Sequence, residues 1–237
     1  MRASLLHLTC AAALLMPLQA SAQLTEGFDD VTALPGWVLQ NSSQPVGPLG
    51  WIQGFADPVN FFTSFSGDAD SYIASTFLAV DFTGTLSNWL LTPELSLFNG
   101  ATFTFYTRAT DVDQSLFPDR LELRLSTSGS STDVGTDAFS VGDFSTLLLS
   151  VNPLLGEQYP TDWTQFSATL SNLTQPVTGR FAFRHFVTDV TETQNAFYIG
   201  IDEVAYATLP MMVPEPGSLW LLSAGMLSFA VHRRRKG

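Results

Sequence analysis

The pattern of apolar and polar residues between positions 23 and 210 predicts β-strands. Over 101–107, phenylalanine alternates with threonine and tyrosine, and over 120–126 leucine alternates with arginine and glutamate. Alternation with one polar side is typical of half-buried antiparallel strands. Further strand candidates are the short apolar runs 71–77, 88–91, 144–151, 163–170, 179–187 and 196–205.

Turn-forming residues separate these runs and interrupt every helical pattern. Examples are Pro35-Gly36, Gly47-Pro48 and Thr92-Pro93, which are typical of turns and loops. About ten strands with frequent turns predict an all-β fold, a two-sheet antiparallel β-sandwich of the jelly-roll type. The 188 residues of 23–210 are enough for one domain with a well-buried core.

The first 22 residues have the pattern of a secretory signal peptide. Arg2 precedes an apolar stretch that ends in Ala20-Ser21-Ala22, a small-residue cleavage site, and we expect cleavage after Ala22. Cys10 is the one cysteine of the sequence and lies in this segment. The exported protein therefore has no disulfide, and Thr9 before Cys10 argues against a lipoprotein signal.

The last residues, 211–237, have the pattern of a membrane anchor. An uncharged apolar run, 218–231, is followed by four consecutive bases at 233–236. At ~1.5 Å per residue the run covers ~22 Å, short for a hydrocarbon core of ~30 Å. The bases would stay cytoplasmic and leave the body outside. An amphipathic or buried core helix is the alternative, although a core helix does not normally end in four bases.

The triplet Pro214-Glu215-Pro216, followed by the apolar run and the basic end, resembles the PEP-CTERM sorting tail of Gram-negative, exopolysaccharide-producing bacteria. The resemblance implies export through the Sec pathway and a transient anchor in the inner membrane. It also implies an exosortase that recognises and cleaves at the triplet. The expected destination is the cell surface or the extracellular matrix of a biofilm.

A second resemblance covers nearly the whole body and rests on short blocks in a fixed order. They are Glu26–Asp29, Pro35–Trp37, Ser71–Ala74, Asn88–Leu95, Asp119–Arg124, Trp163, Phe181–His185 and Ile199–Val204. In this order they resemble the choice-of-anchor J domain, a family similar to cleaved adhesin domains and to MAM-type jelly rolls. The resemblance implies a surface-exposed jelly roll and no common activity.

This resemblance also implies a metal site. In adhesin-like and MAM-like jelly rolls a calcium ion commonly lies near the first strand, between an acid there and an acid of the last strand. Carried over, these acids are Asp29 and Asp202, with Glu26 nearby. Carboxylate oxygens suit Ca²⁺, which would join the two chain ends of a domain without disulfides. The alternative is that these acids are solvated residues at strand edges.

The charge of the body limits its partners. Residues 23–210 contain 21 acids and five arginines, a formal charge of −16. Such a surface repels the phosphates of nucleic acids and anionic lipids, so we expect no nucleic-acid partner.

Catalytic patterns are weak. His185 is the one histidine of the body, so any Ser-His-Asp site must use it, yet it follows Phe181 and Phe183 along a strand, as a hydrogen-bonded structural histidine would. The 21 acids do not single out a glycosidase pair. We therefore expect a non-enzymatic adhesive or structural protein, with an exopolysaccharide hydrolase as an alternative.

Aromatic residues support another alternative, a carbohydrate-binding module for exopolysaccharide. Trp37, Trp51 and Trp163 are candidates for stacking on sugar rings, although aromatics more often fill the core. The phenylalanine-rich stretch 55–65 is expected either to fold over the edge of the sandwich or to form an interaction patch.

Overall fold

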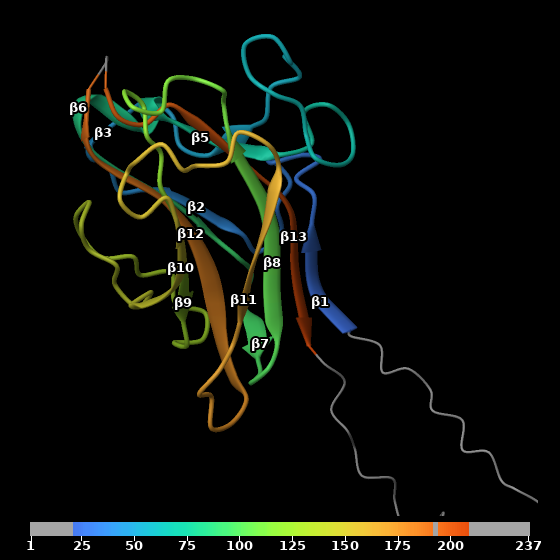
Figure 1. The fold of residues 1–237 in the computed structure, drawn as a ribbon. Coiled ribbons are helices and arrows are strands. Elements are labelled where there is room, and N and C mark those ends of the chain that lie inside the picture. Colours follow the sequence, from blue (N-terminus) through green and yellow to red (C-terminus); the bar gives the residue numbers. More distant parts are fainter. Residues whose placement is uncertain (1–20, 192–193, 209–237) are drawn as a thin grey trace, which may run out of the picture. The chain divides into compact units, whose positions relative to one another are not determined.

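The protein forms two antiparallel β-sheets packed face to face (Figure 1) in a computed structural model that describes residues 21–191 and 194–208. Sheet I contains, in spatial order, β11 (Thr164–Thr169), β8 (Thr102–Ala109), β13 (Tyr198–Thr208), β5 (Ile73–Thr76) and β4 (Ile52–Gln53), with β1 (Ser21–Glu26) also paired with β13. Sheet II contains β10 (Thr146–Val151), β9 (Leu121–Ser126), β12 (Val177–Val190), β6 (Val80–Leu91) and β2 (Val38–Asn41). In addition, β3 (Gln44–Val46) pairs with β6, and β7 (Leu95–Leu97) pairs with β12.

The predicted sandwich is confirmed. The only helical element in the described residues is a short 3₁₀ turn, η1 (Phe77–Ala79). No helix within residues 21–191 and 194–208 is long and apolar enough to cross a membrane. The predicted membrane span, 218–231, and most of the predicted signal peptide lie outside the described residues.

The core lies between the inner faces of the two sheets because the alternating strands place their phenylalanines there. Phe103 of β8 stacks on Phe181 of β12 with ring centroids 4.2 Å apart. One step along, Phe105 meets the edge of Phe183 at 4.8 Å. All four rings are fully buried, and burying a side chain of this size contributes about 1.5–3 kcal/mol.

The outer face of sheet II is also buried, under the segment between β9 and β10. Val134 and Phe144 of that segment pack on Trp89 and Ala182. Buried Arg184 points into the same layer, donates to the carbonyl of Ala138 and to Ser87 Oγ, and lies 3.4 Å from Glu122 Oε2. Strands that are buried on both faces have continuous apolar sequences, and the last residues of β6 show this pattern.

The prediction for β6 was wrong in extent, since the strand begins at Val80 rather than near 88. Its first half shows no alternation: Phe82 has φ 57° and is exposed. The first half of β6 is nevertheless a strand because it pairs with β3, where Gln44 lies opposite Thr85.

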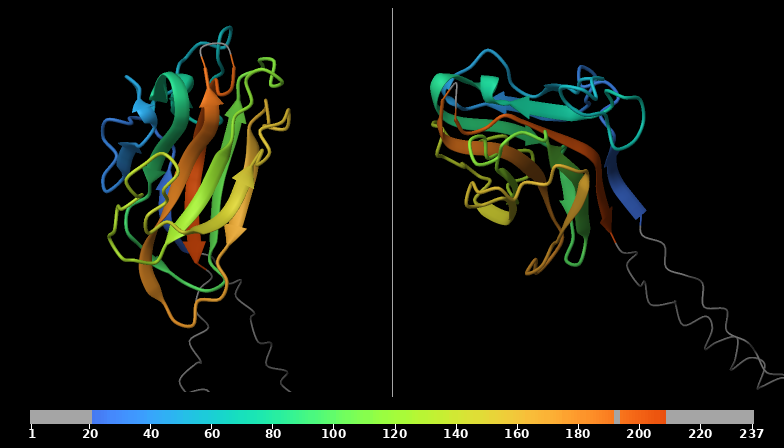
Figure 2. Two further views of the ribbon diagram at one scale, coloured as in Figure 1. Left: turned by 90° about the vertical axis from the view of Figure 1, so that its left-hand side faces the viewer. Right: turned by 45° about the horizontal axis from the view of Figure 1, so that its top comes forward.

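The two ends of the described chain lie side by side. Figure 2 shows β1 next to the end of β13, and Thr25 pairs with Ala205 in an antiparallel register. β1 begins at Ser21, so cleavage after Ala22 would shorten the strand and leave the pairing of Leu24 with Tyr206 intact.

Candidate functional site

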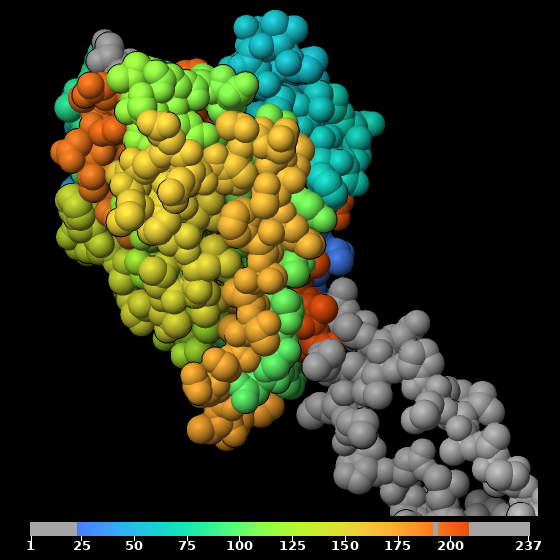
Figure 3. Space-filling model, in the orientation of Figure 1, coloured from blue at the N-terminus to red at the C-terminus, as the bar shows by residue number. Residues whose placement is uncertain are grey.

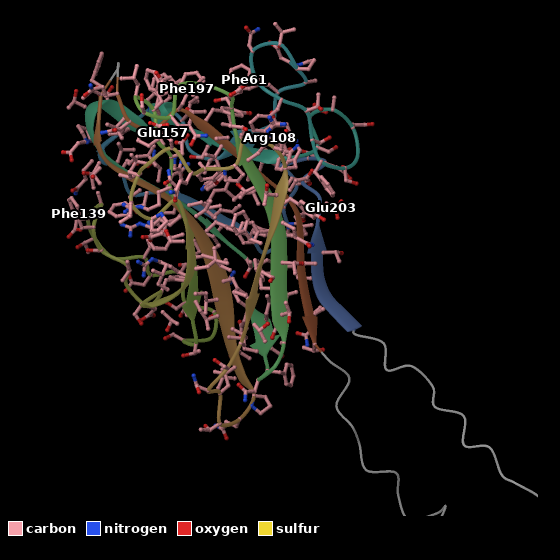
Figure 4. All side chains as sticks on the ribbon, in the orientation of Figure 1. Phe61, Arg108, Phe139, Glu157, Phe197 and Glu203 are labelled. Carbon is pink, nitrogen blue, oxygen red and sulfur yellow. The ribbon has the colours of Figure 1, made fainter. Side chains whose placement is uncertain are left out.

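An acidic cleft lies where β1 meets β13. It has a volume of about 440 Å³ and is lined by Glu26, Asp29, Ser66, Gly67 and Glu203, among others. In Figure 4 the labelled Glu203 lies beside β1. Three carboxylates from near the two ends of the described chain therefore face one hollow, together with Ser66 and Gly67 of the loop before β5.

An irregularity in β13 brings Glu203 to this cleft. The register between β13 and β8 shifts between Asp202 and Ala205, and Glu203 adopts φ 47°. A left-handed residue inside a strand is typical of a β-bulge, which redirects side chains. Sequence reasoning missed Glu203 because its positive φ has no sequence signal when the residue is not glycine.

Asp202, in contrast, does not line the cleft. Its side chain is fully buried, and Oδ2 accepts hydrogen bonds from the backbone N–H of Phe65 at 2.8 Å and of Ser66 at 3.1 Å. Oδ1 accepts from the N–H of Glu203 at 2.7 Å. Burial raises the pKa of Asp202 to about 6, against the opposite effect of these three donors.

Of the predicted metal ligands, Glu26 and Asp29 are brought together in the cleft, and Glu203 joins them. Oxygen donors suit a hard cation such as Ca²⁺. Glu26 Oε1 is already used, since it accepts the N–H of Phe28 at 2.9 Å. In the described residues no three His, Cys, Asp or Glu side chains form a group that could hold a metal ion. The cleft thus offers suitable atoms without a closed coordination shell.

The phenylalanine-rich segment, which we call the aromatic loop (residues 54–71), folds over the outer face of sheet I. Phe62 lies over Gly200 of β13, where an added Cβ would be 2.7 Å from the Phe62 ring. Phe65 stacks on Tyr106 of β8 at 3.8 Å, with ring planes 15° apart. The indole of Trp163 donates to the carbonyl of Thr63 at 2.9 Å. Of the two expectations for this segment, the loop is the one the structure shows, and it covers a sheet face rather than an edge.

The three candidate stacking tryptophans differ in position. Trp37 and Trp51 are 8% and 5% exposed and belong to the main core. Trp37 meets the edge of Phe28 at 5.4 Å. A sugar cannot reach these two rings in this structure. Trp163 is half-buried, and its ring meets Phe62 edge-on at 5.4 Å.

His185 belongs to a buried polar network that joins the two sheets. Its Nδ1 lies 2.9 Å from Ser75 Oγ of β5, and its Nε2 lies 2.9 Å from Asp119 Oδ1. Asn88 of β6 donates to the same Ser75 oxygen. These residues are at most 1% exposed.

The network differs from a hydrolytic triad. In a triad the serine bonds Nε2 and the aspartate bonds Nδ1, whereas at His185 the two nitrogens have the opposite partners. Ser75 is fully buried, so a substrate has no path to its hydroxyl in this structure. His185 is the hydrogen-bonded structural histidine that the strand pattern favours.

Comparison with known proteins identifies a sorting signal at the end of the sequence. Residues 213–235 match the PEP-CTERM protein-sorting motif. The chain carries this sorting motif. The motif indicates an exported, surface-associated protein, and its residues lie outside those that the structure describes.

The fold is similar to solved cleaved adhesin domains of Lys-gingipain from Porphyromonas gingivalis W83. The K1 domain superposes with a TM-score of 0.51 at 23% identity, covering 77% of this chain and 96% of that domain. The K3 domain gives 0.51 at 20% identity, covering 79% and 100%. At this identity the likeness shows the fold, and it confirms the predicted similarity to cleaved adhesin jelly rolls.

A curated relative is hemagglutinin A of the same species, Porphyromonas gingivalis, which is 31% identical over 147 residues, 60% of this chain. The PEP-CTERM-bearing chain covers 5% of the length of that relative. The match therefore concerns one small part of a much larger protein.

Proposed function

We propose that the protein is a non-enzymatic adhesive or structural component of the cell surface or the biofilm matrix. The sorting motif at 213–235 carries this proposal, because it addresses a protein to the outside of the cell. The sandwich it would deliver has the fold of adhesin domains. The one Ser-His-Asp contact of the described body is buried, which favours a role without catalysis.

Export would proceed in stages. The Sec pathway of a Gram-negative cell exports the chain, and the apolar run 218–231 holds it briefly in the inner membrane while the bases stay inside. An exosortase then cleaves at Pro214-Glu215-Pro216, and the acidic body joins the exopolysaccharide outside.

The experiment replaces the triplet by three alanines in a host that has an exosortase. Mass spectrometry of the exported protein should show the tail retained, and cell fractionation should find the protein in the inner membrane. Pro210→Ala is the matched control, since it also removes a proline near the tail and should be processed normally. Normal processing of the triple variant would refute the sorting part of the proposal.

The hydrolase alternative has its own assay. The purified protein is incubated with host exopolysaccharide, and new reducing ends are measured. We expect none. Turnover that is lost on replacing one carboxylate, in a variant that still folds, would replace the adhesive function by a glycosidase.

We also propose that Ca²⁺ draws the carboxylates of Glu26, Asp29 and Glu203 together in the acidic cleft, because the described residues line one hollow there without being grouped as metal ligands. Glu26 of β1 and Glu203 of β13 lie on adjacent strands at the two chain ends, so one ion would join these ends. A ligand at 100 times its Kd adds about 2.7 kcal/mol to stability.

Thermal unfolding with Ca²⁺ and with chelator tests the metal. Calcium should raise the Tm of the wild type and leave Glu203→Gln unchanged. Glu157→Gln, an exposed acid outside the cleft, is the control and should respond like the wild type. Equal melting of all proteins in both buffers would remove the metal from the proposal.

A further inference from the structure

The outer face of sheet I is divided into a covered part and an open part. The aromatic loop covers the part near Gly200 and Tyr106. Beyond it, alternate residues of β8 and β11 point outward, half-buried on β8 and exposed on β11, and Figure 3 shows the aromatic loop projecting from the upper right of the molecule. We call this open part, together with Tyr106 at its border with the loop, the hydroxyl face: Thr102, Thr104, Tyr106, Gln165, Ser167 and Thr169.

The register places these six residues in three rows. Tyr106 lies opposite Gln165, Thr104 opposite Ser167, and Thr102 opposite Thr169. The hydroxyls of Thr102 and Thr169 are 3.3 Å apart, so both point to the same side. Residues two apart on a strand are separated by about 6.8 Å, which makes the face about 14 Å long.

A stacked aromatic pair, Phe65 and Tyr106, which we call the aromatic step, bounds one end of this face. Phe65 is 47% exposed and stacks on Tyr106. The backbone N–H of Phe65 is fixed by its hydrogen bond to Asp202, and the loop is also held by the bond from the Trp163 indole to the carbonyl of Thr63. Ordering these rings in advance lowers the entropy cost of binding a ligand.

The charges around the face decide which ligand it suits. The face itself carries no charged side chain, although the body has 21 acids and five arginines. Exposed Asp162 lies just before β11, and Glu203 lies on β13, which pairs with β8. Arg108 of β8 also lies nearby, with its guanidinium over the Phe62 ring. The two carboxylates outnumber this cation, so the net charge beside the face repels an anionic polymer. A neutral partner with many hydroxyl groups meets no such barrier.

We propose that the hydroxyl face binds a neutral polysaccharide, with a sugar ring against the Tyr106–Phe65 step and sugar hydroxyls bonded to the threonine, serine and glutamine side chains. The apolar faces of sugar rings suit an aromatic surface, and their hydroxyls both donate and accept hydrogen bonds, as Thr, Ser and Gln do. This inference rests on the proposed adhesive function and gives that function a ligand. It uses neither Trp37 nor Trp51.

The test measures binding of the processed, exported protein to a panel of neutral glycans, with alginate as an anionic polymer and a preparation of host surface proteins as a third class. Thr104→Glu places a charge in the middle row, and Tyr106→Ala removes the aromatic step. Each should weaken neutral-glycan binding at least tenfold, and alginate should bind at least tenfold more weakly than the best neutral glycan. Thr146→Glu on β10 of sheet II is the matched control and should bind normally, with circular dichroism used to confirm that every variant is folded.

Three results would overturn the inference: no neutral glycan bound, a glycan bound by both variants as tightly as by the wild type, or binding to alginate or surface protein instead. Cell fractionation of the same proteins separates this failure from that of the proposed function. A wild type that reaches the surface but binds no neutral glycan contradicts the inference alone. A protein that is not delivered to the surface contradicts the adhesive function itself.

Discussion

Asp202 anchors the aromatic loop to sheet I, and Asp202→Ala should release it. The variant removes the acceptor of three backbone N–H groups, those of Phe65, Ser66 and Glu203. Hydrogen bonds to a charged group contribute about 1.5–3 kcal/mol each. Glu203 is exposed, so water can replace Asp202 as the acceptor for its N–H. The bonds to Phe65 and Ser66 therefore determine the loss of stability.

Two such bonds amount to about 3–6 kcal/mol. The variant also no longer buries a carboxylate, whose cost is visible in the raised pKa of Asp202, about 6. This relief offsets part of the loss. We expect the free energy of unfolding to fall by about 2–4 kcal/mol, which is large against a total of about 5–15 kcal/mol for a typical domain.

Urea unfolding at pH 7.5 with chelator present measures this change, and chymotrypsin measures the loop. The loop contains four phenylalanines, Phe55, Phe61, Phe62 and Phe65, and released chain should be cut there first. Asp68→Ala is the control, an exposed acid of the same loop, and should change stability by less than about 0.5 kcal/mol. A loss below about 0.5 kcal/mol for Asp202→Ala, with the loop still protected, would refute the anchoring role.

Three further outcomes are expected. Gly200→Ala should cost about 1–3 kcal/mol in urea unfolding, because the added Cβ would lie 2.7 Å from the Phe62 ring; an unchanged midpoint would mean that the aromatic loop moves freely. Asp119→Ala should cost about 2–4 kcal/mol, because Asp119 Oδ1 bonds both His185 Nε2 and the backbone N–H of Phe197; equal stability would show that water replaces the carboxylate. The third concerns pH: because the pKa of Asp202 is raised to about 6, the folded protein binds this proton more tightly than the unfolded chain. The contribution of this group is therefore full below about pH 4 and is lost as the pH rises through about 6. The stability difference between wild type and Asp202→Asn should change over that interval, and a constant difference from pH 4 to 7 would contradict the raised pKa.

Local patterns were sufficient for much of the fold. The alternation over 101–107 and 120–126 corresponds to β8 and β9, because a strand with one polar face has period two whatever its partners. The expectation that β9 is half-buried was wrong, since Glu122 on its polar face is also buried. The sorting motif was likewise readable, since its triplet, apolar run and bases are contiguous. His185 was correctly assigned to a strand, where it is hydrogen-bonded.

The candidate sites depended more on contacts between distant residues. The sequence alone determined the export address, the strand-rich composition, the acidic charge and the presence of Glu26 and Asp29 near the first strand. Only the tertiary structure decided that Trp37 and Trp51 are core residues, that Glu203 rather than Asp202 joins the cleft, and that the aromatic loop leaves the hydroxyl face open. The bond from Phe65 to Asp202 joins residues 137 positions apart, and no local pattern encodes such a contact because burial and hydrogen bonding depend on which segments meet after folding.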